Sequence, residues 1–230
     1  MADQRLKPSV KLIGASGQTG YVPQKGMLDG TAFTADWLAR MALEGRMYTA
    51  NAGLGTAPFT GGGAYVNTAP DVDMSVPSGA LVIPVRIEVV FETWGTGLLA
   101  EVVAVYGKGG VIAPTSATAV TPVNHRLDIG NDSGVTIVSD GTGATYMTPA
   151  ASIIEFWRPT SKFAITKTAG SATVSADDPS RFEWSALATG VWPIMYATDG
   201  ITRLNIFASA QAPTLFISIT FVKPSIVAET

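Results

Sequence analysis

The segment Leu81–Trp94, LVIPVRIEVVFETW, constrains the fold of this chain more than any other stretch. Apolar residues occupy every second position and charged residues stand between them. Period two with β-branched residues predicts a strand that buries one face and exposes the other. Pro84 has no N–H to donate, which predicts an edge, a bend or a bulge near the start of this strand. The alternating sets are Val85, Ile87, Val89 and Phe91, and Arg86, Glu88 and Glu92.

A second apolar run, Leu98–Tyr106, follows directly after the turn residues Gly95-Thr-Gly97. Two such runs joined by a short glycine-containing loop are typical of a hairpin. We therefore expect Leu99, Val103 and Val105 to lie opposite the first strand.

Short apolar runs separated by turn residues continue through the rest of the chain. Turns are indicated by Asn131-Asp-Ser-Gly134, Asp140-Gly-Thr-Gly143 and Asp199-Gly200. One short helix is expected near Thr34–Gly45, because Thr34 can cap it and Gly45 can end it. Many short strands with one helix predict an all-β protein, a sandwich or a barrel. The further strands are expected at Arg46–Ala50, Val135–Ser139, Ser152–Trp157, Phe163–Thr166, Arg181–Trp184, Trp192–Ala197, Thr202–Ala208 and Thr214–Val222.

The chain of 230 residues reads as one domain preceded by an arm. Residues 1–30 are rich in Gly, Lys, Gln and Pro, which predicts an extended N-terminal arm. Residues 31–230 show neither an internal repeat nor a linker, so we expect a single β-sandwich domain there.

Composition excludes several classes of site. The chain has no cysteine and a single histidine, His125, so disulfides, thiolate metal sites and multi-histidine clusters are excluded. Charged residues make up 14%, against about 25% in an average soluble domain, and the net charge of −3 gives no general attraction to nucleic acid. No apolar run reaches the roughly 18 to 20 residues that span a bilayer, and Met1-Ala-Asp-Gln-Arg does not resemble a Sec-type leader. A chain this apolar favours burial of its surface against other copies of itself.

The glycines of Lys11–Gly20, KLIGASGQTG, follow a short apolar run and resemble the phosphate-binding turn of short-chain dehydrogenases/reductases. That turn requires a helix directly after it, whose N-terminus binds the pyrophosphate. Pro23, Gly26 and Gly30 are incompatible with such a helix. No acidic residue ends a second parallel strand about 20 positions on. We therefore expect a pliable arm segment and no cofactor.

Three other constellations suggest chemistry but have ordinary structural interpretations. Asp71-Val-Asp73 and Asp128–Gly134 carry the oxygen ligands that calcium prefers, yet no loop is complete and such residues commonly form turns. His125 lies near Asp128, but no Gly-x-Ser-x-Gly motif is present. Carboxylates across the expected hairpin suggest glycosidase acids, although alternation places them on a solvated or interfacial face. We expect no metal and no enzymatic activity. These carboxylates are Glu88, Glu92 and Glu101.

Five residues are candidates for an interface. Trp94 and Trp184 stand near strand ends, where aromatic rings can stack on a sugar or on a partner subunit. Arg5, Lys7 and Lys11 lie in the arm, where they can contact the phosphates of a genome or of an internal membrane.

The segment Asp71–Glu92, DVDMSVPSGALVIPVRIEVVFE, resembles the single jelly-roll capsid proteins of tailless or small bacterial viruses. A Val-Pro-Ser-Gly turn leads into a long strand interrupted by proline. The resemblance implies a jelly roll of two four-stranded antiparallel sheets, with copies tiling an icosahedral shell and the arm reaching under neighbouring subunits. It further implies a bacteriophage virion protein assembled in the host cytoplasm, whose partners are other copies and other virion proteins rather than a small-molecule substrate.

Two other functions remain open. The first is a β-sandwich binding module, such as a phage fibre or spike domain or a carbohydrate-binding domain, using Trp94 or Trp184. The second is an enzyme, either nucleotide-binding or a carboxylate hydrolase.

Overall fold

A computed structural model describes residues 9–13, 19–23, 36–53, 56–62, 69–93, 99–109, 116–140, 153–162, 181–208 and 213–224. The chain divides into two compact units, Met1–Arg40 and Met41–Thr230. The division falls ten residues after the expected end of the arm at Gly30, near the middle of the first helix.

The first unit contains a two-stranded antiparallel sheet. Strand β1 (Ser9–Ile13) pairs with β2 (Thr19–Pro23), with Ile13 opposite Thr19. The glycine motif thus leads from one strand into another, where a dinucleotide-binding turn requires a helix.

The expected helix is present in a shorter form. Helix α1 (Trp37–Leu43) begins three residues after Thr34. Gly45 follows it with a φ of 68° and donates its N–H to Ala42 O at 3.0 Å. A glycine in the left-handed region is a common way to end a helix.

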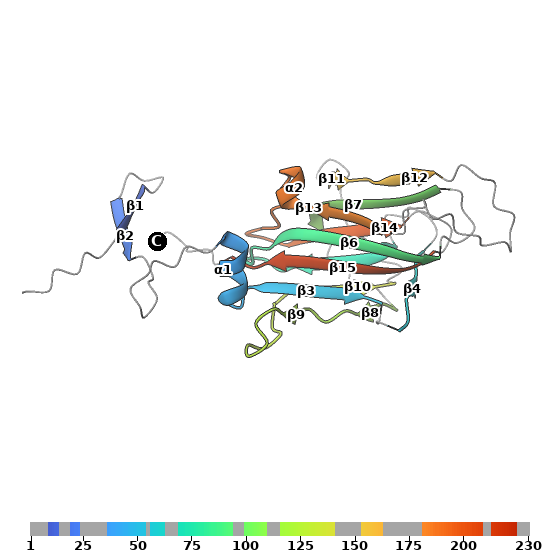
Figure 1. Cartoon of the computed structure of the whole chain (residues 1–230), viewed down its shortest axis with the longest axis horizontal. Coiled ribbons are helices and arrows are strands. Elements are labelled where there is room, and N and C mark those ends of the chain that lie inside the picture. Colours follow the sequence, from blue (N-terminus) through green and yellow to red (C-terminus); the bar gives the residue numbers. More distant parts are fainter. Residues whose placement is uncertain are drawn as a thin grey trace, which may run out of the picture. The chain divides into compact units, whose positions relative to one another are not determined.

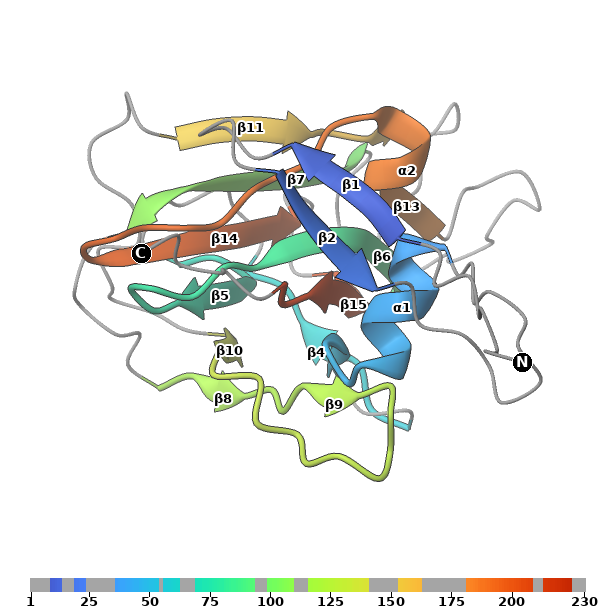
Figure 2. The same ribbon diagram turned by 90° about the vertical axis from the view of Figure 1, so that its left-hand side faces the viewer.

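The second unit is a sandwich of two sheets whose neighbouring strands are all antiparallel. Figure 2 shows the sheets as two layers, and Figure 1 shows their strands running along the sandwich. One sheet has the order β13 (Arg181–Ser185), β6 (Ile83–Thr93), β15 (Thr214–Val222), β3 (Met47–Ala52), β9 (Val123–Asn124), with β4 (Phe59–Thr60) beside β15. The other has the order β11 (Ile153–Trp157), β7 (Leu99–Gly109), β14 (Ile201–Ala208), β5 (Val72–Val76), β10 (Thr136–Ser139), β8 (Thr118–Ala119), with β12 (Thr160–Lys162) beside β7.

Eight of these strands pair in a nested order. Strand β3 pairs with β15, β5 with β14, β6 with β13, and β7 with β11. In the order β3, β5, β6, β7, β11, β13, β14, β15, the first strand therefore pairs with the last and the fourth with the fifth. Paired strands belong to one sheet, and successive pairs alternate between the two sheets.

The predicted hairpin of Leu81–Trp94 with Leu98–Tyr106 is wrong. Both segments are strands, but β6 and β7 belong to different sheets. Each has a partner on both sides, since β6 lies between β13 and β15, and β7 lies between β11 and β14. Neither strand has an edge left for the other.

The alternation of β6 is confirmed. The inward-facing apolar residues Val85, Ile87, Val89 and Phe91 are 0–4% exposed, and Arg86 and Glu88 lie on the opposite, partly exposed face. The expected irregularity at Pro84 is also confirmed, because the register with β15 shifts between Thr220 and Phe221. On the other side of β6, pairing with β13 reaches only Arg86, so no ladder bond is required of Pro84 there.

The remaining expectations are met unevenly. Most of the predicted strands are present, but Trp192–Ala197 makes only a single bridge, from Met195 to Val82. Phe163–Thr166 lies outside the described residues. Helix α2 (Ala186–Thr189) and strand β5 were not expected. Within the described ranges, no helix has the length and apolar character needed to cross a membrane.

Candidate interaction surfaces

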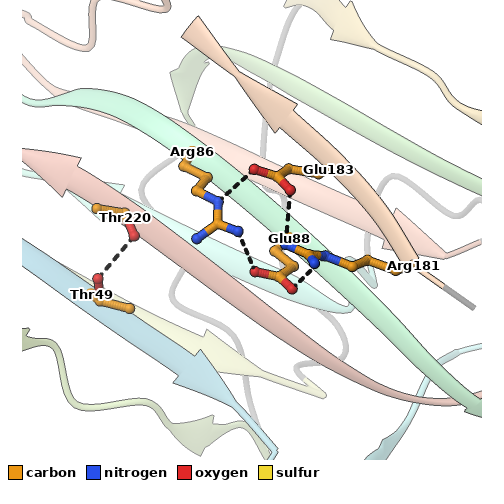
Figure 3. Close-up of polar contacts among 6 residues, drawn as sticks. All are labelled: Thr49, Arg86, Glu88, Arg181, Glu183 and Thr220. Carbon is orange, nitrogen blue, oxygen red and sulfur yellow. Dashed lines mark hydrogen bonds and ion pairs between the residues drawn. The ribbon is translucent and has the colours of Figure 1, made fainter. Parts of the chain in front are cut away.

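Four charged side chains form a closed ring on the outward face of β6 and β13. Glu88 stands directly opposite Glu183 in the register of the two strands. Like charges in that position destabilise a sheet. Arg86 and Arg181 lie on either side of the two carboxylates and separate them (Figure 3). We call these four residues the charge ring.

The geometry of the charge ring is regular. Arg86 Nε donates to Glu183 Oε1 at 2.7 Å, and Arg86 Nη2 lies 2.9 Å from Glu88 Oε2. Arg181 Nε lies 2.7 Å from Glu88 Oε1, and its Nη2 lies 2.8 Å from Glu183 Oε2. The hydrogen bond from Arg86 lowers the pKa of Glu183. Every carboxylate oxygen of the ring thus has a guanidinium partner, and the two positive charges balance the two negative ones.

A hollow of about 370 Å³ lies beside the charge ring on the same sheet. Gly53 bounds it with a φ of 88°, and a Cβ atom there would meet the Phe216 ring at 2.8 Å. Amide, hydroxyl and carboxylate groups next to an aromatic ring suit a small polar ligand. The lining residues are Asn51, Ala52, Gly53, Glu88, Val90, Phe216, Ile217 and Ser218.

His125 contacts a hydroxyl group. Its Nε2 lies 2.7 Å from Thr49 Oγ1, which is also 2.9 Å from Thr220 Oγ1. The carboxylate of Asp128 instead accepts hydrogen bonds from Arg126 Nε and Nη2, both at 2.9 Å. The structure therefore does not bring His125 and Asp128 together as a triad requires.

Asp71 is a buried carboxylate that joins separate segments of the chain. It accepts the N–H of Gly62 and the N–H of Ala208, each at 2.5 Å. Its own carbonyl accepts the N–H of Asp140 at 3.2 Å. Burial raises the pKa of Asp71 to about 6, although the two backbone hydrogen bonds oppose the shift.

Asp73 belongs to a buried polar cluster on the outward face of β5 and β14. It accepts hydrogen bonds from Arg203 Nη1 at 2.5 Å, Ser75 Oγ at 2.9 Å and Asn205 Nδ2 at 2.8 Å. Burial raises the pKa of Asp73, and Arg203 opposes this rise. Both carboxylates of the candidate calcium motif are thus engaged by protein donors. Among the described residues, no three Asp, Glu or His side chains gather to hold a metal ion.

The carboxylates considered as glycosidase acids are not brought together across a hairpin. Glu88 belongs to β6 and the charge ring, whereas Glu101 lies on β7 in the other sheet and pairs with Arg158. Glu92 is exposed near the end of β6, and Thr214 Oγ1 donates to it at 3.4 Å.

One of the five candidate interface residues must be corrected. Trp184 is 1% exposed, and its ring packs edge-on against Phe156 with 4.9 Å between ring centroids. Trp184 is a core residue because exposed and buried residues alternate along β13, which leaves Arg181 exposed and turns Trp184 inward. Helix α2 begins two residues after Trp184. Arg5, Lys7 and Trp94 lie outside the described residues, and Lys11 lies on β1, where only the backbone is described.

A surface that the sequence did not reveal lies on the segment that connects β13 to β14 along the chain. We call it the apolar patch and define it as Leu187, Val191, Trp192, Ile194 and Tyr196, which are 36–62% exposed. The available signal was a run without charged residues from Ser185 to Thr198. That run also fits a buried strand, which is how Trp192–Ala197 was interpreted.

Comparison of the chain with protein-family models, with curated proteins and with solved structures gives no match. Function is therefore inferred from the strand order and from these surfaces.

Proposed function

We propose that Met41–Thr230 is a jelly roll and that the protein is a capsid subunit. The nested pairing of eight strands carries this proposal. The same pairing would result if one long antiparallel ribbon, with β7 and β11 at its tip, were rolled up. Rolling places successive segments of the ribbon in opposite sheets. The resulting orders, β13-β6-β15-β3 and β11-β7-β14-β5, support a double-sheet jelly roll, an architecture found in viral capsid and lectin domains.

Composition and side-chain contacts favour a capsid subunit over the other functions of this architecture. Charged residues are few, at 14%, and mean hydropathy is +0.27. The buried carboxylates Asp71 and Asp73 are engaged in hydrogen bonds that hold the sandwich together. Interfaces between permanent partners are more apolar than ordinary protein surface. In this proposal, copies of the chain form an icosahedral virion shell in the host cytoplasm.

The proposed arm, residues 1–30, lies within the first unit, Met1–Arg40. Its two-stranded sheet is of a kind that is at best marginally stable in water without further packing. A neighbouring subunit, another virion protein, the genome or an internal membrane are the partners proposed for this arm.

Expression of the full chain tests the proposal. Negative-stain microscopy and light scattering are expected to show closed particles or large multimers. Deletion of Met1–Gly30 is expected to change the size or yield of particles and to leave the β-sheet circular dichroism of the sandwich intact. A monodisperse monomer of the intact chain at high concentration would contradict the proposal.

The hollow beside the charge ring favours a second candidate, a carbohydrate-binding or fibre module. Phe216 supplies an aromatic ring there, and Asn51 and Ser218 supply hydrogen-bonding groups. Binding on a glycan array that is lost in Phe216→Ala but kept in Ile154→Ala, whose side chain lies on the other sheet, would support this module. Absence of any glycan binding would count against it.

A further inference from the structure

Asp71 is a buried carboxyl group without a positively charged partner. It is 3% exposed, and each of its side-chain oxygens accepts one backbone N–H, from Gly62 and from Ala208. In the part of the chain that the structure describes, no lysine or arginine pairs with it. Asp73, two residues further on, has such a partner in Arg203. Burial disfavours the charged form of a carboxyl group, and Asp71 has no cation to offset this cost.

The charged groups around Asp71 do not stabilise its ionised form. Directly after β10, Asp140 donates its N–H to Asp71 O at 3.2 Å, and its own carboxylate raises the pKa of Asp71. On β14, Arg203 is engaged by Asp73 and by Ser75. At the start of β15, residues 213–215 carry no charged side chain. Ionisation of Asp71 therefore places a second negative charge beside Asp140.

Residues 59–62, which we call the strap, close over the Asp71 carboxyl group. Strand β4, at the start of the strap, pairs with β15 through only two residue pairs. Beyond β4, Gly61 N donates to Pro213 O at 2.8 Å, and Gly62 N donates to Asp71 Oδ1 at 2.5 Å. Gly61 is buried and Gly62 is exposed, so the end of the strap separates the carboxyl group from water. A segment held by so few bonds can open locally while both sheets stay intact.

Gly61 lets the strap approach Asp71 closely. A Cβ atom at this position would lie 3.2 Å from Asp71 Oδ1 and 3.1 Å from Leu215 Cδ2. Both separations are shorter than ordinary van der Waals contacts, and glycine avoids them because it has no Cβ. The backbone of the strap therefore packs directly against the carboxyl group.

We propose that the strap is a proton-controlled closure: it stays packed over Asp71 while that side chain is protonated, and it lifts to admit water when the side chain ionises. The N–H groups of Gly62 and Ala208 favour the ionised form, but burial outweighs them. Lifting the strap removes the Gly62 hydrogen bond and gives the carboxylate water in its place. The inference goes beyond the capsid proposal and does not depend on it, because every contact involved lies within one chain.

The pKa of Asp71 sets the size and the pH range of the effect. This pKa is about 6 under the closed strap, against an ordinary value of 3.8 for a carboxyl group in water. Opening is therefore favoured progressively as the pH rises from 3.8 to about 6 and changes little above that. The pKa difference limits the increase in the opening equilibrium to about a hundredfold.

Hydrogen exchange in the full-length chain from pH 4 to pH 7.5, corrected for the intrinsic pH dependence of exchange, tests the inference. Protection of the strap amides is expected to fall at least about tenfold between pH 4 and pH 6 and then to level off. The amides of β6 and β15 are expected to stay better protected than the strap at every pH. Asp71→Asn should lose most of the pH dependence of the strap. Asp199→Asn is the matched control, because it changes a carboxylate whose side chain is 83% exposed, and it should behave like the unsubstituted chain.

Three results would overturn the inference. They are strap protection that does not change with pH, an equal pH dependence in Asp71→Asn, and strap amides that exchange only together with those of β6 and β15. The first and third concern the unsubstituted chain, so they remain decisive if Asp71→Asn does not fold. A chain that forms particles and one that stays monomeric are expected to give the same exchange result, so this inference and the capsid proposal can fail separately.

Discussion

Asp73 and Arg203 form an ion pair in which the two side chains are only 3% and 2% exposed. The pair joins β5 to β14 at a distance of 130 residues along the chain. A buried ion pair is costly to desolvate, and removing one partner leaves a buried charge without compensation.

Arg203→Met is therefore expected to lower the free energy of unfolding by about 3–5 kcal/mol. The double variant Asp73→Leu/Arg203→Met is expected to recover much of that loss, because no buried charge remains. Denaturant unfolding measures both. Lys108→Met, which breaks the exposed 3.3 Å pair with Asp199, serves as the control and should cost less than about 1 kcal/mol. Equal losses in Arg203→Met and in the control would show that the buried pair is not important for stability.

Asp71 is expected to make the fold more stable in mild acid. Its pKa is about 6 in the folded protein, against an ordinary value of 3.8. Between these values the folded state holds a proton that the unfolded state lacks. The stabilisation is complete below pH 3.8 and is lost as pH rises through about 6, and it amounts to about 3 kcal/mol.

The comparison with Asp71→Asn isolates this effect, since burial also raises the pKa of Asp140 and of Asp73. Unfolding free energies of both proteins should be measured from pH 4 to pH 7.5. The stability of the unsubstituted protein relative to Asp71→Asn is expected to fall as the pH rises from 4 to about 6 and to level off above that, and a constant difference would contradict the role of Asp71.

Gly109 is expected to tolerate no side chain. A Cβ atom there would lie 2.5 Å from Cδ and 2.6 Å from Cγ of Arg203, so the arginine stem would have to move. Gly109→Ala should destabilise the fold by about 1–3 kcal/mol, as overpacking does. Gly130→Ala, where the new methyl group meets nothing within 4 Å, is the control and should change stability by less than about 0.5 kcal/mol. Thermal unfolding of the two variants side by side gives the answer.

The charge ring is expected to stabilise the sheet only slightly, because its side chains are partly exposed. Arg86→Ala should cost less than about 1 kcal/mol at low salt and still less in 1 M salt, where the charges are screened. Adding Glu183→Gln should reverse part of the loss, because Glu88 then no longer faces a second carboxylate. A loss that is independent of salt would point to packing of the arginine stem instead.

Strands with one solvated face were predictable from sequence. The alternation of β6 follows from Ile87 and Val89 facing the core and Arg86 and Glu88 facing out. The same holds for β15, whose Leu215, Ile217, Ile219 and Phe221 are at most 1% exposed.

Strand β5 was missed because both of its faces are buried. Met74 lies in the core, and Asp73, on the other face, is 2% exposed. In a short sequence segment, a carboxylate indicates a turn or a metal ligand unless its ion-pair partner is known. That partner, Arg203, is supplied by a strand far along the chain, and no local pattern indicates it.

Which strands pair with one another could not be predicted from the sequence either. Nearness in sequence favoured a hairpin of β6 with β7, whereas the structure places β15 beside β6 and β14 beside β7. Exposure also depended on distant contacts, since the single bridge of Met195 to Val82 turns Ile194 outward. Trp184 was misplaced for the same reason, because its contact with Phe156 arises only when the two sheets stack.

The nested strand order also determines when the sheet can form during synthesis of the chain. Thr49 on β3 and Thr220 on β15 are hydrogen-bonded across 171 residues. At about 5–20 residues per second, a ribosome needs about 10 to 30 s to synthesise the chain between them. Strand β3 must wait that long for its central neighbour, so most of this sheet can form only after β15 has emerged. Slow, non-local closure of this kind makes the nascent chain a natural client of chaperones, and any copy released without β15 cannot complete the sheet.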